Sequence, residues 1–572
     1  MAEISLNSEA HTRRSALSLS HAQVDTLAIA AIAAALSLLH SGFVFGVENN
    51  LFHLPIVAGL YDEPQYQDDS FIQSLRYFAS GVWVLLDSTE RYFGNVALLF
   101  LGLDYVSRLV CFLGFLCCAS LLGVVERRDK IIFALIACFT SLLDGDSYAG
   151  AGGLLIRYFT HSEIANGTVL LAIYFAAKAR FIAATLALGA TFFVNAFIAV
   201  WLAPLLALIA VVLLMKQGTS LAAVCSGVAF GAVLCIPLAL PVLHAVLGNP
   251  EFGKPTAFDF VTYLHQYYGG HVLIDATPRS EIFAAEGVAL VGALALRQLG
   301  AQAAEIAAAY LGVALIYAAG VILPHLTGSP LLLNLHLLRS STIVHLLAAL
   351  ALAALAVNWL RSKEPTTVLL ASLIVALSVS RMTILLAIPI MLLPRAIPEA
   401  RDGEPAYLRT MSYLVLASVV LIAWPYSTWQ NLAFNATFAD AVGEWMEVGH
   451  WARSSTPPTA IFLVPLRPRD DAVPAPSTAD VGLSRTGVFE YASHRRVYVD
   501  FKRGAATMWT SSYYEIWWSR FADTEQLSSL AERKAYASRN GIDYVIDLCQ
   551  TAATSGEVLF RTKRLCVVPA RS

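Results

Sequence analysis

Apolar runs, each closed by charged or polar residues, follow one another through residues 1–427. A helix needs about 20 predominantly apolar residues to cross the hydrocarbon core of a bilayer. By this criterion the pattern predicts about thirteen membrane-spanning helices, several of them short. The predicted spans lie near residues 25–45, 95–125, 131–144, 166–178, 181–197, 199–215, 220–247, 285–297, 302–324, 342–360, 365–380, 382–398 and 410–427.

The pattern changes after residue 427, where strand-like runs alternate with helix-like ones. Such alternation is typical of a small α/β domain. We therefore predict a mainly α fold, a polytopic α-helical membrane domain over 1–427 followed by an extracytoplasmic α/β domain over 428–572. The strand-like runs lie at 459–465, 496–501, 543–548 and 557–561.

Composition agrees with a chain that lies mostly in lipid. Hydrophobic residues make up 57% of the sequence, charged residues only 14%, and the mean hydropathy is +0.63, which is far from the composition of an ordinary soluble domain. The 38 basic and 41 acidic residues nearly cancel, so we expect membrane lipids as partners and no nucleic acid.

The distribution of basic residues predicts the orientation. With the N-terminus inside, the inside segments hold 14 Lys and Arg residues, whereas the outside segments before the last span hold 7. Cytoplasmic loops carry the excess of positive charge. This orientation places the first outside loop, 46–94, and the whole segment after residue 428 on the extracytoplasmic side. Loops 145–165, 248–284 and 325–341 lie on the same side.

Cysteines and motifs limit the chemistry. Cys549 and Cys566 lie 17 apart in the polar tail and could form a disulfide in an oxidising compartment. The other six cysteines fall in apolar runs, where a thiol is usually a small hydrophobe. No pattern of zinc ligands occurs, and GxSxG, P-loop and HExxH motifs are lacking.

The stretch "FGVENNLFHLPIVAGLYDEPQYQDDSF", residues 45–71, gathers five carboxylates just after the first span. A carboxylate beside a bilayer is costly to desolvate unless it is paired or functional. Glu48 is the nearest to the span, with Asn49 beside it and His53 close behind. A hydrated helix cap is the alternative for Glu48, and a solvated loop is the alternative for Asp62, Glu63, Asp68 and Asp69.

This layout resembles the type C (GT-C) glycosyltransferases, which use polyprenyl-phosphate sugars. It shares many helices, an acidic first outside loop, and an extracytoplasmic C-terminal domain, over residues 1–430. Segments at 70–93 and 257–273 look like helices lying on the membrane interface. The resemblance implies that Glu48 is the catalytic base, in "VENNLFH" where relatives often carry an acidic pair, with Asp68 or Asp69 as the runner-up.

A second, local resemblance lies in the tail. "HWARSSTPPTAIFLVP", "GVFEYASHRRVYVDFKRGA" and "YYEIWWSRF" look like the terminal domain of a poorly characterised bacterial branch of proteins with this layout. The resemblance implies a multi-pass protein of the bacterial inner membrane, with a periplasmic C-terminal domain.

Transfer from a lipid-linked phosphosugar needs a base for the acceptor hydroxyl and cationic help for the leaving phosphate. Arg339, with His336 nearby, is the first candidate for the phosphate, and Arg157 is the alternative. A snorkelling side chain is the other interpretation of each arginine. The remaining candidates for substrate binding are His53, Asn49, Asp146 and His161, the last two in a loop whose glycines permit close approach of a ligand.

Two further groups of charges stand out. Asp104 and Arg108 are four apart and predict an ion pair within the membrane. In the tail, charges around residues 490–502 predict either a charged sheet edge or an acceptor-binding edge, with Trp517 and Trp518 as stacking platforms.

The leading hypothesis is an inverting glycosyltransferase that moves a sugar from a polyprenyl-phosphate donor to a glycan, lipid or protein acceptor. No cofactor is expected with certainty, and a divalent metal is left open. The alternatives are a polymerase or ligase of lipid-linked glycans and a non-enzymatic transporter. Transporters often carry charges at the membrane midplane, whereas here acids gather at the outer surface.

Overall fold

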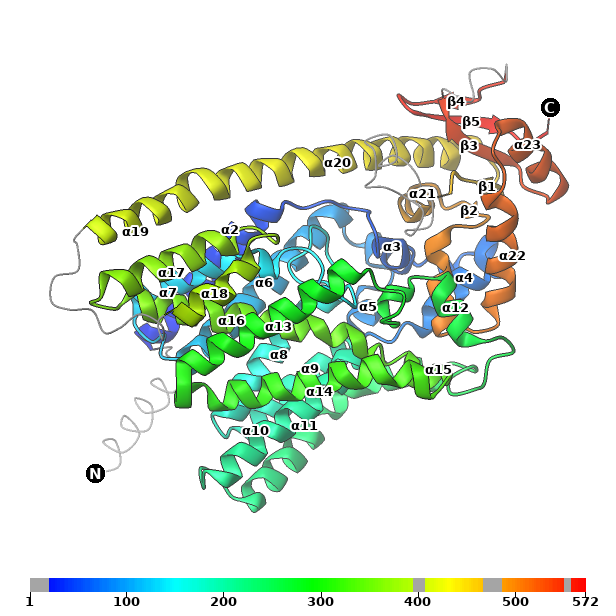
Figure 1. Ribbon diagram of the computed structural model, residues 1–572. Coiled ribbons are helices and arrows are strands. Elements are labelled where there is room, and N and C mark those ends of the chain that lie inside the picture. The colour runs from blue at the N-terminus through cyan, green and yellow to red at the C-terminus, as the bar shows by residue number, and fades with distance from the viewer. Residues whose placement is uncertain (1–19, 394–406, 467–485, 550–556, 572) are drawn as a thin grey trace, which may run out of the picture.

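The computed structural model describes residues 20–393, 407–466, 486–549 and 557–571. It is 73% helix and 4% strand, so the predicted mainly α class is confirmed. Figure 1 shows a bundle of long helices with a small sheet at one end.

Seven helical stretches in the described part of the chain are long and apolar enough to cross a membrane. The predicted number of thirteen spans is therefore not confirmed. Shorter helices that pack among the seven include α7 (Arg127–Phe139), α8 (His161–Ala177), α9 (Phe181–Val194) and α17 (Pro365–Ser378). The seven stretches are α2 (His21–Ser41), α6 (Val96–Leu121), α10 (Ala196–Met215), α11 (Leu221–Gly248), Arg279–Leu326 with α13 (Arg279–Leu299) and α14 (Ala304–Leu326), Pro330–Leu360 with α16 (Ser341–Leu360), and Tyr407–Ser455.

Contacts between helix ends bring the basic residues together at one end of the bundle. Arg361, after α16, reaches the Asp129 carboxylate of α7 at 3.0 Å, and Lys130 donates to Thr26 in the second turn of α2 at 2.9 Å. Arg409 of α19 (Tyr407–Ser418) donates to the carbonyl before α17. These basic residues belong to the set predicted to face inside.

The segment between α2 and α6, which was predicted to be the first outside loop, folds into short helices. α3 (Asn50–Ala58) is followed by η1 (Leu60–Asp62), η2 (Pro64–Tyr66), α4 (Ser70–Ser74), η3 (Leu75–Tyr77), α5 (Gly81–Leu86) and η4 (Thr89–Arg91). The expected interface helix over 70–93 is therefore interrupted. The break falls where the Ser80 hydroxyl donates to the Val194 carbonyl at 2.7 Å and where Gly81 lies against the Phe193 ring. The second expected interface helix is reduced to α12 (Phe260–Gln266) and η6 (Gly269–His271).

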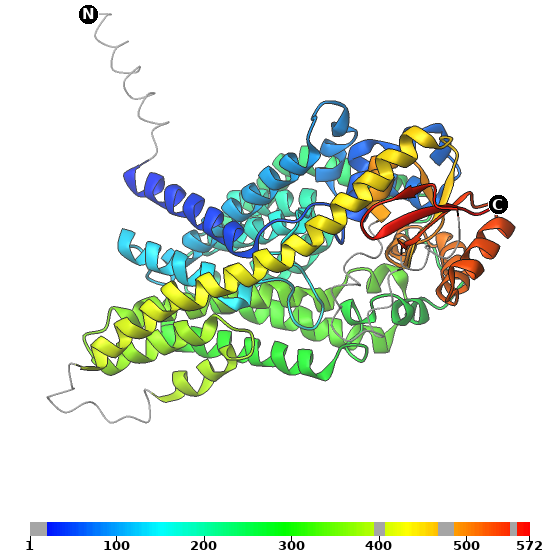
Figure 2. The same ribbon diagram turned by 90° about the horizontal axis from the view of Figure 1, so that it is seen from above.

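One long helical stretch connects the bundle to the tail. α19 continues through the π-helical turn η11 (Val419–Ala423) into α20 (Trp424–Ser455). The expected domain boundary at 427/428 falls inside α20, because this helix runs without interruption from one end of the bundle to the sheet (Figure 2).

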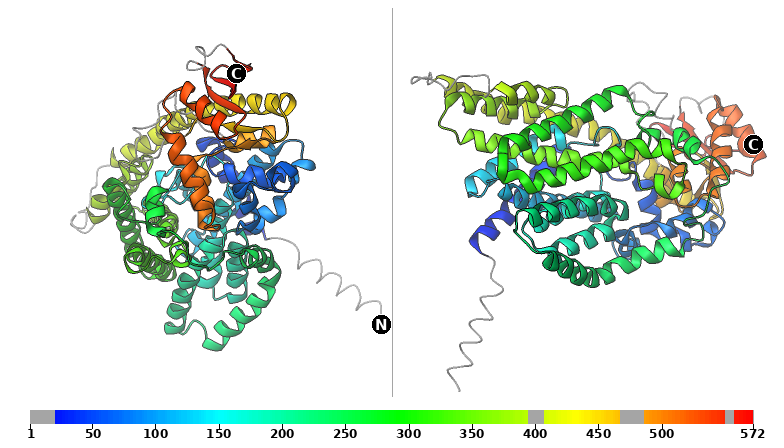
Figure 3. Two further views of the ribbon diagram at one scale, coloured as in Figure 1. Left: turned by 90° about the vertical axis from the view of Figure 1, so that its right-hand side faces the viewer. Right: turned by 60° about the horizontal axis from the view of Figure 1, so that its bottom comes forward.

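The tail forms a five-stranded sheet with the order β2-β1-β3-β5-β4. β1 (Ile461–Leu463) pairs in parallel with β2 (Arg496–Val497) and β3 (Tyr544–Leu548), whereas β5 (Leu565–Pro569) is antiparallel to β3 and β4 (Phe560–Arg561). The helical elements are α21 (Thr486–Ser493), η14 (Phe501–Met508), α22 (Tyr513–Glu525) and α23 (Leu530–Arg539). Seen from the sheet end, these elements lie over the end of the bundle (Figure 3, left).

The main hydrophobic core is continuous between membrane helices and tail. It includes Phe100 of α6, Trp445 of α20 and Trp517 of α22, all fully buried. A second, smaller cluster around Val545 and Cys566 lies within the sheet. The tail therefore packs as part of the same body as the bundle.

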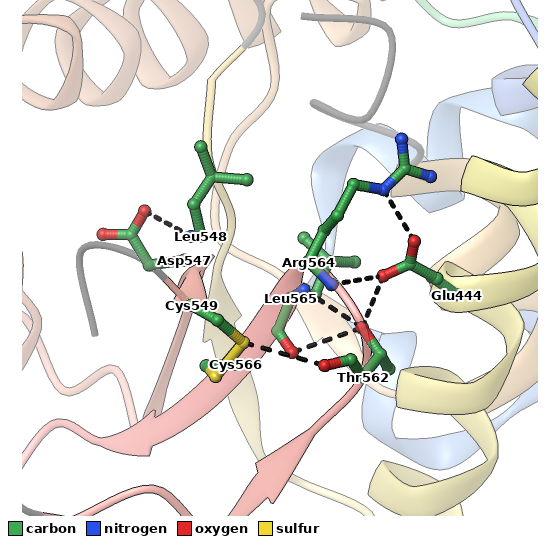
Figure 4. The surroundings of a disulfide bond; sticks show 8 residues. All are labelled: Glu444, Asp547, Leu548, Cys549, Thr562, Arg564, Leu565 and Cys566. Atoms are coloured by element: carbon green, nitrogen blue, oxygen red, sulfur yellow. Dashed lines mark hydrogen bonds and ion pairs between the residues drawn. A yellow bond between two sulfur atoms is a disulfide. The ribbon is translucent and has the colours of Figure 1, made fainter. Parts of the chain in front are cut away.

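The sequence left open whether Cys549 and Cys566 form a disulfide; in the structure they are bonded, with Cα atoms 4.9 Å apart. The bond lies beside the β3–β5 pairing (Figure 4). Glu444 of α20 holds the neighbouring turn, because its carboxylate accepts from the Thr562 hydroxyl at 2.6 Å and from the Arg564 backbone amide at 2.7 Å.

Candidate functional site

Glu48 stands at the turn between α2 and α3, with a left-handed backbone conformation (φ 48°). Its carboxylate Oε2 lies 2.7 Å from the Lys502 ammonium, and both side chains are partly accessible, at 29% and 16% exposed. The acid after the first span is thus paired with a cation of the tail.

Lys502 lies on η14 and is held by groups from two directions. Asp500, the N-cap of η14, accepts from the Lys502 backbone amide at 2.8 Å. The Tyr267 hydroxyl donates to the Lys502 carbonyl at 3.0 Å, and the ammonium lies 5.5 Å from the centre of the Tyr268 ring. Cation and aromatic ring attract each other at this distance, so the loop before α13 supports the pair.

Two more charged residues complete what we call the Glu48 group: Glu48, Asp146, Arg339 and Lys502. Asp146 lies within electrostatic range of the other three. Arg339 comes from η8 (Leu337–Ser340) and donates to the Ala151 carbonyl at 3.1 Å. The group therefore contains two acids and two cations, contributed by four segments that are distant in the sequence.

The side chain of Asp146 remains exposed to solvent although protein surrounds it on most sides. Burial raises the pKa of this carboxyl, while Arg339 lowers it, and Glu48 adds a second raising contribution. Asp146 is therefore the member of the Glu48 group most accessible to solvent.

The glycines of loop 140–160 serve a packing purpose. A Cβ on Gly150 would come within 2.6 Å of the Leu338 carbonyl and 2.9 Å of the Arg339 Cα. A Cβ on Gly152 would come within 1.9 Å of the Thr342 hydroxyl. The glycines were expected to let a ligand approach the loop closely, but the segment around Arg339 occupies that space instead. This packing fixes the position of Arg339 relative to Asp146.

His53 and His161 are buried packing groups behind the Glu48 group, within electrostatic range of Lys502 and Arg339 respectively. His53 is 1% exposed and stacks on Trp83 at 3.8 Å between ring centres, and the Trp83 indole donates to His161 Nδ1 at 3.0 Å. The structure gives neither ring a surface for substrate. Asn49 stays half-buried next to Glu48. Asn50, which sequence reasoning did not select, accepts from the Gly46 amide at 3.0 Å and shapes the turn.

The two runner-up acids lie in different surroundings. Asp68 is exposed. Asp69 is 7% exposed, caps α4 by accepting from the Ile72 amide at 3.0 Å, and lies 3.9 Å from Arg503. Neighbouring residues of the tail thus hold both acids of the outer loop: Lys502 holds Glu48, and Arg503 faces Asp69.

Arg503 also forms a buried ion pair with Glu490 of α21. Both side chains are almost fully buried, at 2% and 0% exposed, and the guanidinium covers the Phe71 ring at 4.6 Å. Burial raises the pKa of Glu490 to about 7, although Arg503 opposes the shift. This pair ties the outer loop, α21 and η14 into one unit behind the Glu48 group.

Arg157 and His336, the other two candidates for phosphate binding, lie in different places. Arg157 lies against α20, where it donates to the Asn435 amide oxygen at 3.3 Å and covers the Phe434 ring at 4.7 Å. His336 lies beside Arg339 in electrostatic range, with its ring 5.6 Å from that of Phe197. Of the three, His336 and Arg339 stay together.

Of the two tryptophans considered as stacking platforms in the tail, Trp517 is too buried to stack against a ligand. Trp517 is fully buried and donates its indole N–H to the Asp500 carbonyl at 3.1 Å, because it fills the space under η14, next to Gly504. Trp518 is partly exposed. The charged residues of the tail also lie largely inside: His494 pairs with Glu63 at 2.6 Å.

Within the described ranges, no group of three or more His, Cys, Asp or Glu side chains is placed to hold a metal ion. We therefore derive no step through a metal.

Comparisons with known proteins give no family and no function for this chain. Neither a family model, nor a curated protein, nor a solved structure matches the chain.

Proposed function

We propose that the protein is a membrane glycosyltransferase that moves a sugar from a polyprenyl-phosphate donor to an acceptor at the periplasmic face of the bacterial inner membrane. The observation that carries the proposal is the Glu48 group. It combines a carboxylate 2.7 Å from Lys502 with the Asp146 and Arg339 pair, next to solvent and at the end of the first candidate span.

The proposed reaction uses these charges in two roles. The Glu48 carboxylate takes the proton of the acceptor hydroxyl as its oxygen attacks the anomeric carbon. The bond between that carbon and the phosphate oxygen breaks, and the electron pair stays on the prenyl phosphate. Arg339 and Lys502 stabilise the negative charge that develops on the leaving phosphate. Attack from the face opposite the phosphate inverts the anomeric carbon.

Pairing with Lys502 explains how Glu48 would wait for substrate. In the structure the ammonium compensates the carboxylate. The phosphodiester of a bound donor carries one negative charge, as Glu48 does, and the phosphate gains further negative charge as its bond to the sugar breaks. This developing charge draws Lys502 away from Glu48. The freed carboxylate then accepts a proton. Donor binding therefore precedes activation of the acceptor.

The topology supports a periplasmic site. The basic residues at one end of the bundle favour that end as cytoplasmic under the positive-inside rule. The Glu48 group and the sheet belong to segments on the opposite side of the spans. We further propose that the shorter helices α7, α8, α9 and α17 cross the membrane with the seven longer stretches.

The test is an assay of the purified protein in proteoliposomes with a panel of polyprenyl-phosphate sugars and glycan, lipid and peptide acceptors. Glu48→Gln keeps the shape of the side chain but removes the base, and we expect a loss of about 10²- to 10⁴-fold in turnover. Asp62→Asn is the matched control, because Asp62 is an exposed carboxylate of the same outer loop.

Full turnover in Glu48→Gln contradicts the role of Glu48 as base. Failure of every donor to bind or react, with a folded protein, contradicts the enzyme class. Transfer that requires a lipid-linked glycan as acceptor assigns the protein to the polymerases or ligases.

Transport is the second candidate, favoured by one observation. Asp104 and Arg108, both fully buried in α6, form an ion pair 3.4 Å apart, and charges inside a membrane often mark ion pathways. A flux of labelled sugar phosphate across the proteoliposome membrane without transfer would support this candidate.

A further inference from the structure

Three ionisable side chains are buried together between α6 and α8. Asp104 and Arg108 of α6 are 0% exposed and Glu163 of α8 is 2% exposed. The Arg108 Nε lies 3.4 Å from Asp104 Oδ2, which confirms the predicted ion pair. Glu163 adds a second carboxyl, so the triad holds two acids and one cation.

The triad bonds both backbone groups of one residue, Ile156, in loop 140–160. Arg108 donates through Nη2 to the Ile156 carbonyl, and Glu163 Oε1 accepts from the Ile156 amide at 2.7 Å. Arg108 Nη1 also donates to the Ser37 hydroxyl of α2 at 3.1 Å. Asp146 belongs to the same loop. The triad therefore helps to hold Asp146 in its position within the Glu48 group.

Two carboxyl oxygens of the triad point into this enclosed space. Asp104 Oδ2 and Glu163 Oε2 are buried and neither accepts a hydrogen bond, although Asp104 Oδ2 lies within ion-pair distance of Arg108. The two carboxyl groups lie within hydrogen-bonding reach of each other. Two carboxylates cannot bond to each other without a proton, whereas one proton between them provides a donor for one oxygen and an acceptor in the other.

The charge balance leads to the same conclusion. With both acids ionised, the triad would carry a net charge of −1 away from water, and an uncompensated buried charge costs several kcal/mol. The other titratable groups that interact with the triad are Cys111 of α6, Cys138 of α7, Tyr158 of the loop and His40 of α2. Thiols and phenols are neutral at pH 7, and His40 also faces Asp144.

We propose that the Asp104–Arg108–Glu163 triad is a proton-binding site, which holds one proton between its two carboxyl groups at neutral pH. The bound proton makes the triad electrically neutral and leaves its hydrogen bonds to the Ile156 backbone intact. This inference does not depend on the proposed glycosyl transfer.

A small pocket lies close to the triad. It has about 240 Å³ of space not filled by atoms, including the part open to solvent, and is lined by Ser37, His40, Asp144 and Leu155 among others. Ser37 belongs both to the pocket wall and to the hydrogen bonds of Arg108. The wall of the pocket therefore lies one hydrogen bond away from Arg108, the cation of the triad.

Infrared spectroscopy of the purified protein at neutral pH tests the proposal directly. A protonated carboxyl gives a carbonyl band separate from the carboxylate bands, and the band shifts in heavy water. We expect this band in the wild type and in Glu490→Gln, which removes the other carboxyl whose pKa lies near 7. The band should be lost when Glu163→Gln or Asp104→Asn is added to Glu490→Gln. Glu126→Gln, which changes an exposed carboxylate before α7, should leave the spectrum unchanged.

Thermal unfolding provides the second readout. Each single variant keeps one anion opposite Arg108, so each should unfold near the wild-type temperature. The double variant Asp104→Asn with Glu163→Gln leaves Arg108 without an anion and should lose most of its folded yield. Absence of the band from the wild type or from Glu490→Gln, its survival after both additions to Glu490→Gln, or a double variant as stable as the singles would each overturn the proposal.

Discussion

The Lys502 ammonium lies 2.7 Å from the Glu48 carboxylate although the two residues are 454 positions apart in the chain. The contact joins the first outside loop to the C-terminal tail. Neither segment contains both charges, so the proposed site exists only when the tail is packed on the bundle. The neighbouring pair of Arg503 with Glu490 and Asp69 makes that packing firm.

Removal of the Lys502 charge should weaken binding of the donor. Lys502→Met keeps much of the length of the side chain but loses the ammonium, and a hydrogen bond to a charged group contributes about 1.5–3 kcal/mol. We expect the affinity for a polyprenyl phosphate to fall about 10- to 100-fold, measured by calorimetry in detergent.

Two variants make that measurement specific. Lys502→Arg keeps the charge and should bind within a few fold of the wild type. Lys254→Met changes an exposed lysine of another outside loop and should have no effect. Equal binding by Lys502→Met and the wild type would remove Lys502 from the site.

The buried pair behind the site should control stability. Arg503→Met leaves the fully buried Glu490 without its cation, and breaking such a pair costs about 3–5 kcal/mol. We expect a clear drop in the thermal midpoint of the purified protein. Arg76→Met breaks the exposed pair with Asp62 and should cost at most about 1 kcal/mol.

Glu490 should also make stability depend on pH. Its pKa is raised from 4.5 to about 7 in the folded protein, first because of burial. Between these values the folded state binds more protons than the unfolded state, so stability falls as pH rises through this window and levels off above about 7. Unfolding midpoints from pH 5 to 8 should show this slope in the wild type.

Glu490→Gln cannot titrate and should lose that part of the slope. Because glutamine resembles the protonated acid, the variant should match the wild type best at low pH. A slope that persists unchanged in Glu490→Gln would assign the titration to another group.

Local patterns predicted what depends on neighbours in the sequence. The spacing of Asp104 and Arg108 predicted their ion pair, because residues four apart share one face of a helix. The two cysteines of the tail indicated a possible disulfide, which the structure contains. Apolar runs predicted a helical membrane protein, although their lengths did not settle how many helices cross.

Contacts between distant segments could not be predicted in this way. Lys502 was recognisable only as one of several charges on a strand-like run, and no local signal joined it to Glu48. Trp517 looked like a platform because its burial depends on the packing of η14 over it. The interruption of the helix over 70–93 likewise arises from contacts with Phe193 and Val194 of α9.

The glycines beside Arg339 give a prediction of positioning. Gly150→Ala introduces a Cβ 2.6 Å from the Leu338 carbonyl, at a positive φ of 121°. The chain around Arg339 must move, so we expect lower activity and a lower thermal midpoint. Gly153→Ala is the matched control in the same loop, since its Cβ meets no atom closer than 3.4 Å. Equal effects of the two substitutions would contradict a specific role for the contact.

The disulfide should stabilise the sheet that the tail places over the bundle end. It closes a segment of 17 residues between β3 and β5, and a loop of about this length corresponds to about 3 kcal/mol of stabilisation. Cys549→Ser with Cys566→Ser should therefore lower the thermal midpoint. Cys225→Ser, which changes an exposed free cysteine of α11, should not.

The same bond reports the compartment of the tail, because disulfides persist where the environment is oxidising. Labelling of free thiols in denatured protein from intact bacterial cells should find Cys549 and Cys566 blocked until a reductant is added. Deletion of the periplasmic oxidation machinery should expose both thiols. Two cysteines that are freely labelled in wild-type cells would place the tail in the reducing cytoplasm, and the Glu48 group with it.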